Sequence, residues 1–149
     1  TQLYRAETVA FFVGISQVTG QPSLFRCRGN ELSGDCVAEE LVEGVENLQL
    51  VYGLSDIVRG RPTGNISEIA TAADLGDATT SAANRQNWLR VGTVQMGLVM
   101  RHTEQRSGGD PRELPYSLLG SEVSAPVDDR RVRTTYETSV ALRNRLFGN

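Results

Sequence analysis

Histidine and cysteine are the residues of this sequence best suited to acid-base or nucleophilic chemistry, and the chain contains few of either. His102 is the single histidine, so a histidine-dependent triad or a histidine-rich metal site would have to be built on it. A small hydrolase that uses His102 as a base or Cys27 as a nucleophile is the enzymatic alternative. No G-x-S-x-G or other nucleophile motif accompanies them. We therefore interpret His102 as a surface residue at a strand end, and we predict no catalytic residue.

The two cysteines, Cys27 and Cys36, are nine positions apart across a polar stretch that contains two glycines. In the chain-entropy model, closing so short a loop contributes about 2.6 kcal/mol. We predict a disulfide, which an oxidising compartment allows. A pair of free thiols is the alternative. A zinc site is disfavoured, because only His102 could add a nitrogen ligand.

Charged side chains gather at several places without forming a recognisable ligand site. The acidic pairs at positions 39–40 and 128–129 are adjacent in sequence, and adjacent residues in a strand point in opposite directions. Arg130, Arg131 and Arg133 could receive a phosphate or an acidic partner, but edge protection or local ion pairing is the interpretation we prefer. No glycine-containing segment matches the P-loop or the dinucleotide fingerprint. We predict no cofactor and no metal.

Composition describes an ordinary globular domain. The chain has 149 residues, of which 39% are hydrophobic and 22% charged, so it can form a single core and we expect one domain over residues 1–149. All 15 basic residues are arginine, and the formal net charge is -3. Without a net basic surface, nucleic acid is not expected as the principal partner.

Hydrophobic periodicity predicts several strands. Apolar residues alternate over residues 8–15, and a short return strand is expected at residues 24–27. Trp88 is expected to introduce another strand. The clearest pattern is the final one, residues 132–142, in which β-branched and apolar residues alternate with polar ones as in an amphipathic antiparallel strand.

Helical and loop signals lie between these strands. Apolar residues at i, i+4 and i+7 predict a helical turn over residues 39–48, followed by a strand. Glycine and proline predict a loop within residues 55–64. A capping-box pattern predicts a short helix over residues 65–76. Residues 103–129 show little periodicity and are expected to form a long connection.

Three segments resemble a known family in matching order. Residues 40–53, ELVEGVENLQLVYG, are similar to the "LVEGVE-x-LQ-x-x-YG" signature of PilW-type minor pilins. Residues 23–26 are similar to the family's "SLYR" strand, and residues 131–144 to its ending "RRRV-x-STTV-x-LRN". The acidic, glycine-rich stretch that family members often carry after the YG pair is absent here, so calcium binding is not carried over.

The resemblance implies a fold and a role. The fold would be α+β and β-rich, a pilin-like head of antiparallel sheets with short helices. The family's leader and long hydrophobic N-terminal helix are missing, so we expect a trimmed soluble head whose full-length parent is anchored in the inner membrane with its head in the periplasm. The role would be structural, in a tip complex of a type IV pilus that primes assembly and can present an adhesin. Such pili would serve adhesion and twitching motility.

The implied partners are other minor pilins and the pilus-tip adhesin. The candidate partner-binding residues are Leu41, Val45, Tyr52, Arg131 and Arg133. Two alternatives to the minor pilin stay open at this point. One is the type II secretion pseudopilin J, which resembles PilW in architecture, and the other is an adhesive module that binds a surface through residues 103–129.

Overall fold

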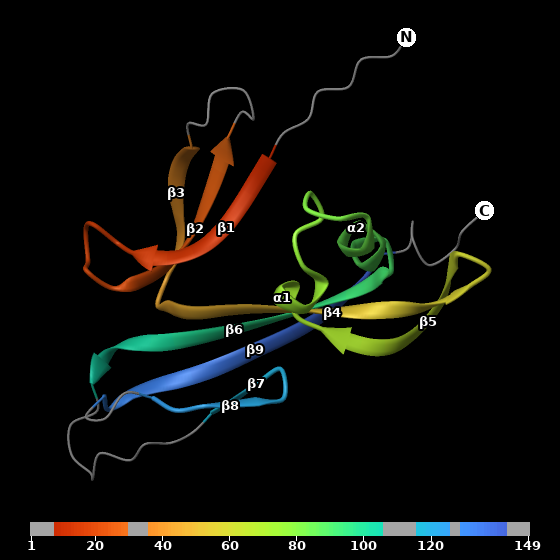
Figure 1. Ribbon diagram of the computed structural model, residues 1–149. Coiled ribbons are helices and arrows are strands. Elements are labelled where there is room, and N and C mark those ends of the chain that lie inside the picture. The colour runs from red at the N-terminus through yellow and green to blue at the C-terminus, as the bar shows by residue number, and fades with distance from the viewer. Residues whose placement is uncertain (1–7, 30–35, 106–115, 126–128, 143–149) are drawn as a thin grey trace. The chain divides into compact units, whose positions relative to one another are not determined.

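The computed structural model describes residues 8–29, 36–105, 116–125 and 129–142 (Figure 1). These residues are mostly in strands, which pair in antiparallel sheets, with two short helices. The predicted β-rich α+β class is therefore confirmed. The elements in chain order are β1 (Thr8–Ile15), β2 (Pro22–Gly29), β3 (Cys36–Glu43), β4 (Val45–Val58), β5 (Arg61–Ala70), α1 (Ala72–Leu75), α2 (Ala82–Leu89), β6 (Val91–Gln105), β7 (Tyr116–Leu118), β8 (Ser121–Val123) and β9 (Arg131–Ala141).

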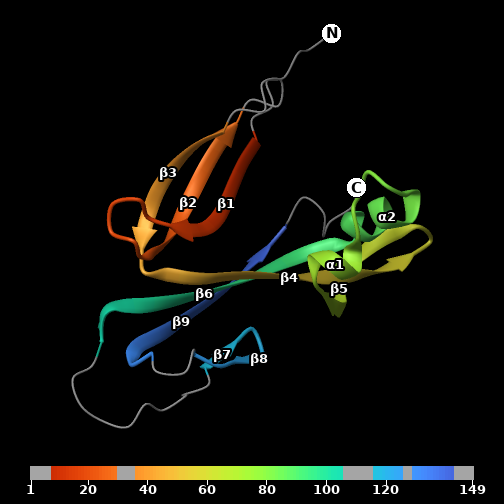
Figure 2. The same cartoon turned by 60° about the vertical axis from the view of Figure 1, so that its left-hand side comes forward.

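The first sheet has three strands in the order β1-β2-β3, which lie side by side in Figure 2. β1 pairs antiparallel with β2 over its whole length, without a shift in register. β2 pairs antiparallel with β3, and the register shifts between Leu24 and Phe25, where Leu41 is the extra residue on β3. The predicted strands at residues 8–15 and 24–27 are both confirmed.

A glycine joins this sheet to the next one. Gly44 lies between β3 and β4 with φ of 88°, a conformation that favours glycine. Its N–H donates to the carbonyl of Pro22 and its carbonyl accepts from the N–H of Arg101, at 2.8 and 2.7 Å. The predicted helical turn at residues 39–48 is wrong. The apolar residues that suggested it belong to two strands, β3 and β4, which are separated by Gly44.

The second sheet has four strands in the order β5-β4-β6-β9. β4 and β5 form an antiparallel hairpin around Arg59 and Gly60, both of which have positive φ. Most of the loop predicted at residues 55–64 is therefore strand. The final strand predicted at residues 132–142 is confirmed as β9.

Two capped helices follow β5. Thr71 caps α1 in a capping box with Asp74, and Ser81 caps α2 by accepting from the N–H of Asn84. The helix predicted at residues 65–76 is wrong over most of its length, because those residues continue β5 to Ala70. The capping box exists, but it lies farther along the chain.

Trp88 lies in α2, not at the start of a strand as predicted, whereas the strand expected after it is present as β6 and begins at Val91. Its indole N–H donates to the carbonyl of Gly76 at 2.6 Å, and its ring meets that of Tyr52 edge-on at 5.1 Å between centroids. Both rings pack against a buried cluster that forms the core here. Its members are Leu54, Ala70, Leu75 and Val91.

The chain divides into two compact units. Unit 1 contains Thr1–Leu48, Leu98–Tyr116 and Val123–Thr135, and unit 2 contains the remaining residues. The single domain expected over residues 1–149 stays a prediction. In the part of the chain that the structure describes, no helix is long and apolar enough to cross a membrane. Residues 106–115 and 126–128 of the predicted connection lie outside the described residues, and β7 and β8 pair within the remainder.

Candidate functional site

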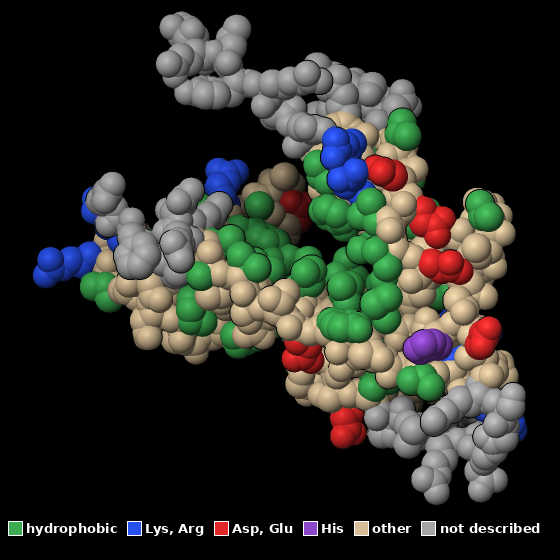
Figure 3. Space-filling model, turned by 180° about the vertical axis from the view of Figure 1, so that it is seen from behind, with side chains coloured by type: hydrophobic (Ala, Val, Ile, Leu, Met, Phe, Trp, Pro, Cys, Tyr) green, Lys and Arg blue, Asp and Glu red, His purple; other side chains and the backbone are tan. Residues whose placement is uncertain are grey.

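The β1-β2-β3 sheet of unit 1 exposes hydrophobic side chains along its surface (Figure 3). Every residue of β3 is exposed, and Val37 retains 79% of its accessible surface. A large exposed apolar patch often marks a contact site. The register places most of the exposed hydrophobic residues on one face of the sheet, and Phe12 on the opposite face. The exposed large hydrophobic residues of these strands are Val9, Phe11, Phe12, Ile15, Val37, Leu41 and Val42.

One face of this sheet combines apolar side chains with an ion pair. Phe11, Arg26 and Glu39 are cross-strand partners and so share a face. The Arg26 Nη2 atom lies 2.5 Å from Glu39 Oε2, and this hydrogen bond and the charge of Arg26 lower the pKa of Glu39. Val9 and Val37 both align with Arg28 of β2 and lie on this face too. Arg28 is exposed, and its charge adds to that of Arg26 in lowering the pKa of Glu39. The face therefore combines its hydrophobic residues with one ion pair and one further arginine.

The opposite face is held by polar and aromatic contacts. The rings of Phe12 and Phe25 stack with centroids 5.4 Å apart. The carboxylate of Glu40 accepts from the hydroxyls of Ser16 and Ser23 at 2.8 and 2.7 Å, and both serines are buried. A charged carboxylate bonded to buried hydroxyls fixes the β1–β2 turn against β3.

A disulfide joins β2 to the start of β3. Cys27 and Cys36 are bonded, with their Cα atoms 5.6 Å apart, so the predicted pairing is confirmed. Both cysteines of the chain are consumed in this bond. Cys27 therefore has no free thiol to act as a nucleophile.

A second feature of unit 1 is the arginine–carboxylate cluster, which we define as Glu46, Arg101, Asp129, Arg131 and Arg133. Arg133 bridges Glu46 at 2.7 Å and Asp129 at 2.6 Å, and both of these carboxylates are largely buried. Arg131 contacts Asp129 at 3.3 Å, and Arg101 lies 3.6 and 3.8 Å from the two carboxylates. The cluster thus links β4, β6 and β9, and each of its guanidinium groups already has a carboxylate partner.

The cluster shifts the ionisation of its members. Burial alone would raise the pKa of Asp129, but hydrogen bonds from the Arg133 side chain and the Arg131 backbone outweigh it and lower that pKa. Burial would lower the pKa of Arg133, but its hydrogen bonds to Glu46 and then Asp129 outweigh burial and raise that pKa. Burial and the Glu46 carboxylate raise the pKa of Tyr116. These charges stabilise one another, as expected of a structural ion-pair network.

The structure places the five predicted partner-binding residues in different surroundings. Leu41 is exposed on β3, whereas Val45 retains only 1% of its surface. Tyr52 packs against the core of unit 2, and Arg131 and Arg133 belong to the arginine–carboxylate cluster. The five residues thus differ in exposure and in partners, and their part in binding stays a prediction.

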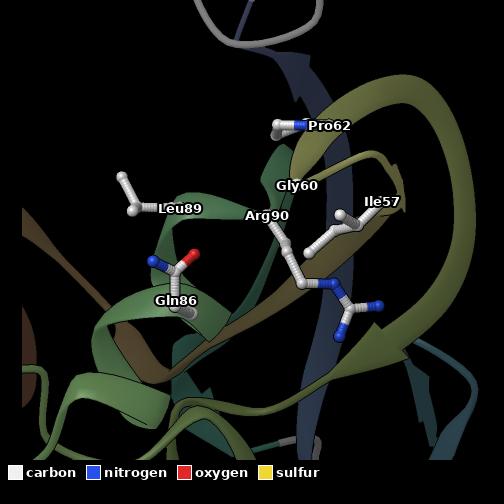
Figure 4. Close-up of a pocket in the computed structure, with 6 residues that line it drawn as sticks. All are labelled: Ile57, Gly60, Pro62, Gln86, Leu89 and Arg90. Atoms are coloured by element: carbon white, nitrogen blue, oxygen red, sulfur yellow. The ribbon is translucent and has the colours of Figure 1, made fainter.

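The remaining candidates for chemistry are His102 and a pocket in unit 2. His102 is exposed on β6, and the described residues include no group of three or more histidine, cysteine or acidic residues placed to hold a metal. A pocket of about 220 Å³ lies between the β4–β5 turn and the end of α2 (Figure 4). Arg90 lines it, but its guanidinium bonds the carbonyl of Ser55 and the carboxylate of Glu68. The pocket lining offers no nucleophile; its residues are Ile57, Gly60, Pro62, Gln86, Leu89 and Arg90.

Sequence reasoning found only part of the cluster. Local ion pairing of Arg131 and Arg133 with Asp129 was expected and is present. Glu46 and Arg101 were missed. Each is followed by polar residues in its strand, so local sequence gives no signal that it is largely buried and paired.

Comparison with known proteins assigns the family. The chain has no significant match among curated proteins or among solved structures. The PilW family, described as Type IV Pilus-assembly protein W, matches residues 10–144. That match covers nearly all of the described strands. The chain therefore belongs to the PilW family of type IV pilus-assembly proteins.

Proposed function

We propose that this chain is the head of a structural minor pilin, which binds other minor pilins in the complex that primes assembly and occupies the pilus tip. In this role the full-length protein is held in the inner membrane with its head in the periplasm before it enters the pilus. It presents the tip adhesin through its neighbours. The family supports a part in pilus assembly, and the finer role is our inference.

The observation that carries the proposal is the exposed apolar surface of the β1-β2-β3 sheet. Hydrophobic side chains on β1 and β3 remain exposed, although unit 2 buries residues of the same types in a core. Burial of such side chains in a partner contributes about 25 cal/mol per Å² of apolar surface. A subunit that assembles with neighbours gains that contribution at the interface.

The test uses the full-length protein, co-purified with the other minor pilins of its own pilus. Leu41→Glu on β3 is the disrupting variant, because a charge placed in an apolar interface must lose its hydration. Leu89→Glu on α2 is the matched control, since Leu89 and Leu41 are similarly exposed, at 46% and 38%. We expect a stoichiometric complex that Leu41→Glu weakens about tenfold and Leu89→Glu leaves unchanged. Absence of a complex with any minor pilin would overturn the proposal.

A further inference from the structure

β1 differs in composition from the other edge strands of its own sheet and of the four-stranded sheet. Its sequence, TVAFFVGI, contains neither a charged residue nor a proline. Edge strands usually carry charges or proline, which discourage pairing with another chain. The other three edges carry such residues, which are Glu39, Glu40 and Glu43 on β3, Pro62 and Glu68 on β5, and Arg131, Arg133 and Glu137 on β9.

The backbone of β1 offers a row of hydrogen-bonding groups on the side away from β2. Next to β1, the N–H of Ser16 donates to the carbonyl of Gln21 at 2.8 Å, in the same register as the strand pair. In an antiparallel ladder, hydrogen-bonded pairs alternate with pairs that are not bonded. The even-numbered residues of β1 therefore bond β2, and the odd-numbered ones direct their N–H and C=O groups to the free edge. These odd-numbered residues are Val9, Phe11, Val13 and Ile15.

A second contact supports the same alternation. Pro22, which stands opposite Ile15, accepts at its carbonyl from the N–H of Gly44. Its carbonyl is thus directed to the β3 side and away from β1. Ile15 and Pro22 form a non-bonded pair, as the alternation requires. Among the described strands, only β2 pairs with β1.

We infer that an extended, mainly apolar strand of another pilus subunit pairs with the free edge of β1 and adds a fourth strand to the β1-β2-β3 sheet. The inference rests on the proposed function and names the binding mode. Strand addition derives its affinity from main-chain hydrogen bonds and its specificity from alternate side chains. Here the odd-numbered residues supply both, because each of them is apolar and also directs its backbone to the free edge.

The chemistry of the edge selects the partner strand. A directly opposite side chain on the added strand lies about 5 Å from an apolar residue of β1. A charge opposite Phe11 would lose water without gaining a counter-ion, because the adjacent Arg26 is already paired with Glu39. Val9 differs, since the residue next to it on β2 is the exposed Arg28. The partner strand is therefore expected to be apolar or hydroxyl-bearing opposite Phe11, Val13 and Ile15.

Two substitutions at one position distinguish the contribution of a backbone hydrogen bond to binding from the contribution of the side chain. Phe11→Pro removes an N–H that faces the free edge and leaves the β1–β2 ladder intact, whereas Phe11→Thr removes the same ring but keeps the N–H. For the full-length protein with the other minor pilins of its pilus, we expect Phe11→Pro to weaken binding about tenfold or more. We expect Phe11→Thr to weaken it less than about fivefold. Val13→Pro and Val13→Thr repeat the test, and thermal unfolding shows that each variant folds.

Amide hydrogen exchange, followed by nuclear magnetic resonance, provides a readout that does not depend on a variant. In the free chain the amides of Phe11 and Val13 should exchange quickly, and those of Phe12 and Gly14 slowly. In the complex, the amides of Phe11 and Val13 should slow at least tenfold. Unchanged exchange at these two amides in an otherwise stable complex would overturn the inference.

The outcomes separate the binding mode from the proposed function. A complex that both proline variants weaken selectively supports both proposals. A complex that no variant at these positions weakens overturns strand addition and leaves the proposed function standing. Absence of any complex overturns both. Self-association of the chain that Phe11→Pro abolishes would assign the edge to a second copy of this chain and overturn the inference of a different subunit as the partner.

Discussion

The β1-β2-β3 sheet and the core of unit 2 contain similar hydrophobic residues and use them in different ways. In unit 2, Leu54, Leu75 and Val91 belong to a buried core, and Leu75 is the buried residue of the capped helix α1. In the three-stranded sheet, the hydrophobic residues of β1 and β3 are exposed, and a disulfide, an ion pair and a ring stack hold the strands together. Unit 2 therefore has a buried core of its own, although some of its large hydrophobic residues are exposed as well. Under the proposed function, we infer that the sheet of unit 1 uses its exposed apolar residues for contact with a partner. The exposed large hydrophobic residues of unit 2 are Leu50, Ile57, Val58, Ile69, Leu89, Tyr136 and Val140.

The largest expected effect separates these two regions directly. Leu75→Ala should destabilise the chain by about 3 to 4 kcal/mol, because Leu75 retains only 1% of its surface and the substitution leaves a cavity. Ile15→Ala in β1, where Ile15 is 59% exposed, should cost less than about 0.5 kcal/mol. Chemical denaturation of both variants measures the contrast. Equal losses would mean that β1 belongs to a core of its own.

Gly44 tests how the first sheet is joined to the second. Gly44→Ala should cost about 3 kcal/mol, because φ is positive there and a Cβ would lie 2.8 Å from the carbonyl oxygen of Arg101. Gly20→Ala is the matched control, since φ is again positive but no atom lies within 4 Å of the added Cβ. It should cost about 1 kcal/mol. Similar values for both, measured by denaturation, would show that the close approach at Gly44 has no energetic weight.

The disulfide tests how far the exposed sheet depends on a covalent link. Reduction should lower the free energy of unfolding by about 2.6 kcal/mol, the entropy of closing so short a loop in the unfolded chain. The double variant Cys27→Ser with Cys36→Ser should show the lower stability in the absence of reductant. Denaturation with and without reductant measures both. A double variant as stable as the oxidised protein would contradict the role of the bond.

The arginine–carboxylate cluster gives the smallest expected effect and a pH signature. Asp129→Asn should cost about 2 kcal/mol at neutral pH, because the charge-assisted bonds to Arg133 and Arg131 are weakened. The folded pKa of Asp129 is lowered, so its stabilisation is complete above the ordinary value of 3.8 and is lost as pH falls through the folded value. The wild type and Asp129→Asn should therefore converge in strong acid.

Glu122→Gln, at an exposed residue, is the matched control for that pH profile. It should match the wild type in stability at neutral pH. Denaturation curves from neutral pH to about pH 2 would measure all three proteins. A difference between the wild type and Asp129→Asn that does not change with pH would contradict the assigned cause.

Strands in which apolar and polar residues alternate could be predicted from the local sequence pattern. The strand at residues 8–15 and the last strand were found in this way, because their apolar residues recur at every second position. Pattern failed where tertiary structure divides a segment. At residues 39–48 a helical spacing spans two strands and a glycine, which no local rule reveals.

The candidate site was predictable only in part. The disulfide follows from two cysteines at a short spacing, and the ion pairs of Asp129 follow from adjacent charges. The contribution of Glu46 and Arg101 depends on strand pairing between β4 and β6, so it required the fold. The free edge of β1 likewise depends on sheet order, because composition alone does not reveal which strand lies at an edge.

The most direct test of the account is hydrogen exchange, measured by mass spectrometry, of the chain alone and in a complex with the other minor pilins of its pilus. The account predicts slower exchange in β1 and β3 on binding, with no change in α2. Slower exchange confined to α2 and the β4–β5 turn would place the interface at the pocket of Figure 4 and contradict the central claim.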